Sequence, residues 1–124
     1  MTIMVTNKHW SGEKQGDIYI GRPSVLGNPY SHLEKTIAKF RVHTRDESIE
    51  KYEEYLRKEY RKKRDIYWEI LRLAVNYRKY KTMTLVCWCK PAACHGDFLV
   101  TAIIKVSESE IVKSIVESNQ TEEQ

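Results

Sequence analysis

The chain has 124 residues, of which 41% are hydrophobic and 31% charged, a balance typical of one small folded domain and unlike that of a disordered chain. No apolar stretch is long enough to span a bilayer, and the amino terminus lacks the regions of a signal peptide. We therefore expect a cytoplasmic protein with no membrane partner, whose three cysteines stay reduced.

The order of the predicted elements indicates a small α/β domain. Short β-rich runs predict strands at Thr2–Thr6 and Asp17–Ile20, and a buried strand is expected at Met83–Trp88. Apolar residues at helical spacing predict helices from Thr44, over Ile66–Tyr80, over Phe98–Val106 and, more briefly, over Ser107–Val116. We expect a single Rossmann-like domain over residues 1–116, with a sheet of few strands flanked by helices, and a flexible tail over residues 117–124.

A loop between Gly21 and Tyr30 is the first segment that could carry chemistry. Two glycines and two prolines in ten residues argue against regular structure there. Backbone N–H groups of such a loop can approach a phosphate, and Arg22, Ser24 and Asn28 add polar donors. The loop lacks both familiar phosphate-binding patterns, and a rigid turn with an exposed arginine explains it equally well.

All three cysteines lie in the second segment, next to a histidine. If Cys87, Cys89, Cys94 and His95 held zinc, the ligand number would be right, but the spacing is unusual. If the protein is an enzyme, Cys94 is a nucleophile at a helix start, with His95 or another histidine as its base. In the interpretation that we favour, the cysteines are small packing residues and the helix start beside His95 binds a phosphate or carboxylate.

A run of positive charge lies at Arg57–Arg64, where six of eight residues are basic. Such a run is typical of a solvated helix face, and no aromatic stacking pattern accompanies it along the sequence. We therefore rank nucleic acid low among the expected partners. Tyrosines and Trp68 on the exposed faces of the two long predicted helices favour a homo-oligomer instead.

Two motifs in a fixed order, YIGRPSVLGNPY and LVCWCKPAACHGDFL, with TRDESIEKYEEYL between them, resemble the uncharacterised family called domain of unknown function 4326. The resemblance covers about residues 18 to 104 and implies a stand-alone small domain found in bacteria and their phages. The family pattern matches the following residues: Gly21, Arg22, Leu26, Gly27, Asn28, Pro29, Cys87, Trp88, Cys89, Pro91, Cys94, His95 and Gly96. A looser analogy links the chain to phage proteins that sequester immune nucleotide signals.

The two segments together predict a site for a nucleotide-derived anion, such as an ADP-ribose-type molecule or a cyclic nucleotide, with no cofactor. Arg22 is expected to pair with phosphate, Tyr30 to stack on the ligand, and Lys90 to flank it. The predicted ligand-binding residues are Gly21, Arg22, Ser24, Gly27, Asn28, Tyr30, Cys89, Lys90, Cys94, His95 and Gly96. We expect binding without turnover, and a host-cytoplasm location if a phage encodes the protein. The alternatives are a Cys94/His95 enzyme acting on a nucleotide or modified base, and a metal-stabilised interaction domain.

Overall fold

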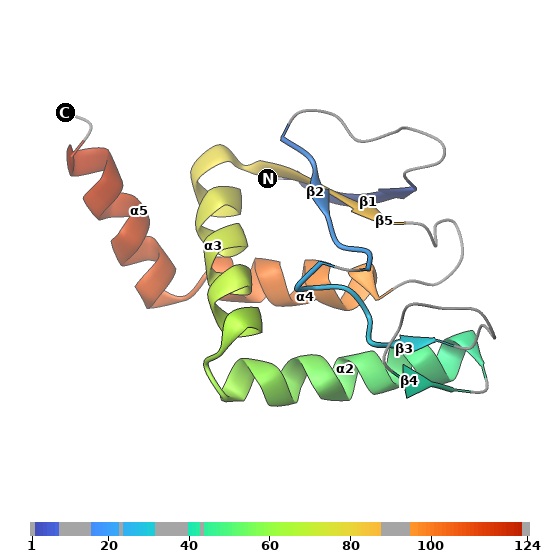
Figure 1. Cartoon of the computed structure of the whole chain (residues 1–124). Helices are drawn as coiled ribbons and strands as arrows, with labels where there is room; N and C mark the ends of the chain where they lie inside the picture. The colour runs from blue at the N-terminus through green and yellow to red at the C-terminus, as the bar shows by residue number, and fades with distance from the viewer. Residues whose placement is uncertain are drawn as a thin grey trace.

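The computed structural model describes residues 2–7, 16–22, 24–31, 40–42, 44–87 and 95–122. At its centre is a parallel sheet of three strands in the order β1-β5-β2, formed by Thr2–Asn7, Thr82–Cys87 and Ile18–Tyr19 (Figure 1). Leu85 of the central strand lies opposite Val5 on one side and Ile18 on the other. The small α/β fold expected from the sequence is confirmed.

Four helices complete the described domain: α2 (Arg45–Arg61), α3 (Asp65–Tyr80), α4 (Gly96–Ser107) and α5 (Glu110–Glu122). Helices α3 and α4 pack against each other and against the sheet, and α5 packs on α3 (Figure 1). Within the described residues, no helix is long and apolar enough to cross a membrane.

The core lies between the helices and one face of the sheet. Side chains alternate across a strand, so Met83, Leu85 and Cys87 of β5 share this face, and all three are buried with Leu73 of α3 and Leu99 of α4. Burial of this kind supplies most of the free energy that favours folding.

Helix α2 begins as the sequence predicts. The Thr44 side chain accepts a hydrogen bond from the backbone N–H of Glu47 at 3.0 Å, which satisfies one of the otherwise unpaired donors of the first turn. Ser48, Tyr52 and Leu56 recur every four residues and form the buried stripe of this helix.

Two features differ from the sequence-based expectations. The short strands β3 (Tyr30–Ser31) and β4 (Phe40–Arg41) pair in parallel and were not predicted, since two-residue strands leave no periodic pattern. Helix α5 continues to Glu122, past the predicted end at Val116 and into the expected tail. Val116 is the last buried apolar residue, but no glycine or proline follows it, so nothing in the sequence stops the helix.

Because the three strands are parallel, their carboxyl ends lie at one edge of the sheet. Asn7 ends β1, Cys87 ends β5, and the segment that starts at Ile20 follows β2. Ligands of open parallel sheets bind at this edge, so it is the candidate site of the domain.

Candidate functional site

The segment after β2 folds as two successive turns. The N–H of Ser24 donates to the carbonyl of Gly21 at 2.9 Å, and the N–H of Gly27 donates to the carbonyl of Ser24 at 3.0 Å. The Ser24 hydroxyl also donates to the Gly21 carbonyl, at 2.5 Å. Of the residues predicted to contact ligand, Ser24 therefore has a clear role in closing its own turn.

Glycine is required at position 27 by close backbone packing. A Cβ there would lie 2.9 Å from the carbonyl oxygen of Gly21 and 3.1 Å from the Cα of Arg22. These are backbone atoms, which cannot rotate away as a side chain could. Gly27 therefore allows the backbone at position 27 to pack directly against the backbone of Gly21 and Arg22.

Two buried side chains of this region fasten the segment to helix α2. The Asn28 amide donates to the hydroxyl of Ser48 at 2.9 Å and to its carbonyl at 3.3 Å. The Tyr52 hydroxyl donates to the carbonyl of Leu26 at 2.8 Å. The structure thus turns the amide of Asn28, which the sequence analysis assigned to ligand, toward α2.

His95 connects this segment to helix α4. Its Nε2 lies 2.8 Å from the carbonyl oxygen of Ile20. A carbonyl only accepts, so Nε2 carries the proton and donates. The edge of the imidazole meets the ring of Tyr52, with centroids 4.9 Å apart and planes at 74°. One histidine therefore bridges the segment after β2, α2 and the start of α4.

Burial lowers the pKa of His95, because the charged imidazolium would lose its hydration. The hydrogen bond to Ile20 and the nearby Cys87 and Asp97 raise the pKa in part, whereas the positive charge of Arg22 lowers it further. The balance favours a neutral imidazole protonated at Nε2.

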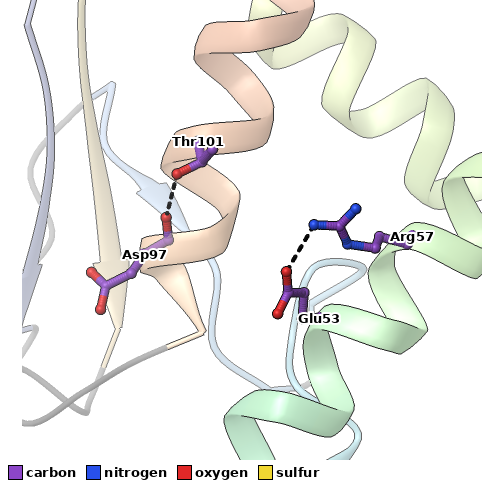
Figure 2. A network of polar contacts seen from close by, with 4 residues as sticks. All are labelled: Glu53, Arg57, Asp97 and Thr101. Atoms are coloured by element: carbon purple, nitrogen blue, oxygen red, sulfur yellow. Dashed lines mark hydrogen bonds and ion pairs between the residues drawn. The ribbon is translucent and has the colours of Figure 1, made fainter.

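Helix α4 starts tightly against the sheet because its first residue is glycine. A Cβ on Gly96 would lie 2.9 Å from Cδ1 of Ile20 and 3.1 Å from Cγ1 of Val5. Asp97 follows in the first turn with an exposed side chain, and its carbonyl accepts a hydrogen bond from the Thr101 hydroxyl at 3.3 Å (Figure 2). The positive end of the helix dipole therefore lies at the carboxyl edge of the sheet.

Arg22 and the start of α4 carry the charges of the candidate site. The Arg22 side chain is half-buried, and its carbonyl accepts a hydrogen bond from the Tyr19 hydroxyl at 2.8 Å. Gly21 is buried beside the Tyr19 ring, which a Cβ at position 21 would strike. A guanidinium and a helix amino terminus are both complementary to an anion.

Several predicted site residues fall outside the described structure: Cys89, Lys90 and Cys94, together with the side chain of Tyr30. Of the four proposed zinc ligands, the described part contains only Cys87 and His95, and both are buried. In that part no cluster of three or more metal-ligating side chains forms. The metal and Cys94-nucleophile alternatives remain predictions.

Sequence analysis did not identify the buried residues that hold the site together. Ser48 and Tyr52 belong to the buried stripe of α2, and no pattern in the sequence indicates their polar contacts to the segment after β2. Asn7 is also buried, opposite Cys87 in the sheet register. Its position, a polar residue directly after the predicted strand Thr2–Thr6, is the one signal that could have singled it out.

The fold and this edge define a small α/β domain in which Arg22, Asp97 and the amino terminus of α4 lie near the carboxyl edge of a parallel sheet. Residues 5–105 match the family model described as Domain of unknown function (DUF4326), and the chain belongs to that family. No curated protein and no solved structure matches the chain. The expected family is therefore confirmed, and the analogy to phage proteins that sequester immune signals has no support in the match.

Proposed function

We propose that this domain binds a small nucleotide-derived anion, of the ADP-ribose or cyclic-nucleotide type, at the carboxyl edge of its sheet. The observation that carries the proposal is the bond from His95 Nε2 to the Ile20 carbonyl. It fixes the turn that bears Arg22 against the start of α4, so a guanidinium and a helix amino terminus act on the same region. A phosphate there would gain a charge-assisted hydrogen bond as well as the favourable helix dipole.

Asp97 favours a ligand that contains a sugar. An exposed carboxylate in the first turn of α4 repels a bare phosphate, but it can accept hydrogen bonds from ribose hydroxyls. Acidic residues have this role in dinucleotide-binding domains with parallel sheets. Arg22 for phosphate and Asp97 for ribose together fit a phosphorylated nucleoside better than an inorganic anion.

Isothermal titration with ADP-ribose, AMP, cyclic AMP and inorganic phosphate tests the proposal. Arg22→Ala should weaken binding of the preferred nucleotide by about ten- to a hundredfold, the loss typical of one hydrogen bond to a charged group. Arg57→Ala is the matched control, because that arginine pairs with Glu53 at 2.9 Å on α2 (Figure 2) and should leave affinity unchanged.

A second comparison, of ADP-ribose with inorganic phosphate, tests whether Asp97 contacts the sugar of the ligand. Asp97→Asn should weaken binding of ADP-ribose while leaving or improving the binding of inorganic phosphate, since it removes a negative charge. Recovery of intact ligand after denaturation of the complex agrees with binding without turnover. Equal affinities of Arg22→Ala and wild type, or no binding of any probe at millimolar concentration, would refute the proposed site.

A further inference from the structure

A second surface lies at the turn between α2 and α3, at the carboxyl end of α2 (Figure 1). It consists of the cations Arg61, Lys63 and Arg64 and the aromatic residues Tyr60, Tyr67 and Trp68, and we call it the basic-aromatic surface. Tyr52, which contacts His95 at the candidate ligand site, lies nine residues before Arg61, so α2 separates the two regions by about 14 Å along its axis.

The aromatic residues of this surface form a continuous cluster. The rings of Tyr60 and Tyr67 have centroids 5.1 Å apart, and those of Tyr67 and Trp68 lie 5.0 Å apart in an edge-to-face arrangement. Trp68 is nevertheless 60% exposed, far more than a tryptophan that serves only as packing. The cluster holds Trp68 from one side and leaves much of its ring open to solvent.

The three cations of the basic-aromatic surface are exposed to solvent. Residues 57–64 carry a net charge of +5, whereas the whole chain carries +4, so positive charge is concentrated here. Two flanking cations are neutralised, Arg57 by Glu53 and Lys62 by Glu59. Arg61, Lys63 and Arg64 form no ion pair with any carboxylate in the described parts of the chain, and Lys63 Nζ lies 6.0 Å from the centre of the Tyr67 ring.

Two residues in the turn between α2 and α3 are not the residue types that would stabilise the turn most. Lys63 has a φ of 52°, a left-handed conformation for which glycine or asparagine is preferred. Arg64 stands at the N-cap of α3 and forms no capping hydrogen bond there, although serine, threonine or aspartate would stabilise that position. Cations occupy two positions where folding favours other residues, which is the behaviour expected of functional residues.

We propose that the basic-aromatic surface binds single-stranded nucleic acid, with unstacked bases on Trp68 and backbone phosphates beside Arg61, Lys63 and Arg64. Exposed aromatic rings next to unpaired cations are the combination that such ligands use, because every base has a face that can stack. A duplex keeps its bases stacked and offers only phosphates. The sequence showed no aromatic pattern because the rings come from two helices and meet only through the turn.

Fluorescence anisotropy with labelled 20-nucleotide probes tests this inference. The probes are single-stranded dT20, single-stranded rU20 and a 20-base-pair DNA duplex, so that DNA and RNA are distinguished. Trp68→Ala should weaken binding of the preferred single strand by about five- to a hundredfold, while Trp68→Phe should recover much of it. Tyr80→Ala is the matched control, since Tyr80 is 64% exposed at the far end of α3 and lies beside Lys79.

The salt dependence of binding tests the cations. The double variant Lys63→Ala/Arg64→Ala should lower the slope of log affinity against log salt by about 1.4, since each phosphate contact to a single strand contributes about 0.7. Lys51→Ala/Lys105→Ala removes the same charge from exposed positions on α2 and α4 and should leave the slope unchanged. Circular dichroism and Tm confirm that each variant folds.

Three kinds of result would overturn the inference. The first kind shows that the surface attracts any polyanion: duplex binding as tight as single-strand binding, or no effect of Trp68→Ala when the charge variant weakens binding. The second is displacement of the probes by polyglutamate at equal charge, which would indicate an acidic protein partner. The third is a wild-type dimer that Trp68→Ala converts to a monomer in light scattering, which would make this surface the self-association face.

Discussion

Replacement of His95 by glutamine tests whether the bridge between the two segments depends on a neutral imidazole. Burial lowers the pKa of His95, so below its ordinary value near 6.5 the unfolded chain takes up a proton that the folded chain refuses. Wild-type stability should therefore fall as the pH drops through that value, by about 1.4 kcal/mol for each pH unit until the lowered pKa is reached. Gln has an amide donor at the position of Nε2 but does not titrate.

The assay is urea denaturation of wild type and His95→Gln between pH 7.5 and 5.5, with Tm as a second readout. For a domain of this size, 1 kcal/mol corresponds to about 3–5 °C in Tm. His95→Gln should be less stable at pH 7.5, since it loses the ring contact with Tyr52. It should then lose less stability than wild type as the pH falls. If both proteins lose stability equally, His95 is not held neutral, and the argument from its burial fails.

Three further substitutions test individual contacts of the site by urea denaturation. Gly27→Ala should cost about 1–3 kcal/mol, because its Cβ would lie 3.1 Å from the Cα of Arg22; a cost near zero would show that the segment adjusts freely. Asn28→Ala should cost a similar amount by leaving buried acceptors on Ser48 without their donor, and retention of full stability would contradict that role. Thr44→Ala removes the N-cap of α2 and should cost about 0.5–2 kcal/mol while nucleotide affinity stays unchanged; a matching loss of affinity would link the cap to the site.

Much of the fold could be predicted because it is encoded by local patterns. The N-cap at Thr44 and the four-residue spacing of Tyr52 and Leu56 act within one helix, where neighbouring residues decide the structure. The apolar run in β5 likewise indicates a central strand. Strands β3 and β4 were not predicted, because each has only two residues and forms only by pairing with the other.

The segments that form the candidate site could be predicted from the sequence, but the hydrogen bonds between them could not. Gly21 and Arg22 after a strand, and His95 before a helix, indicated which segments carry chemistry. That His95 donates to Ile20, 75 residues away, depends on the packing of α4 against the sheet, which no spacing in the sequence records. For the same reason, the hydrogen bond from the Asn28 amide to Ser48 in α2 could not be predicted from the sequence.

The most direct test of the central claim is native mass spectrometry of the purified protein titrated with ADP-ribose. The proposal predicts one bound ligand per chain for wild type and for Arg57→Ala, and loss of that species for Arg22→Ala. It also predicts that the ligand released on denaturation has its original mass. Unaltered ligand occupancy in Arg22→Ala, or a stoichiometric metal mass in place of any nucleotide, would contradict the account.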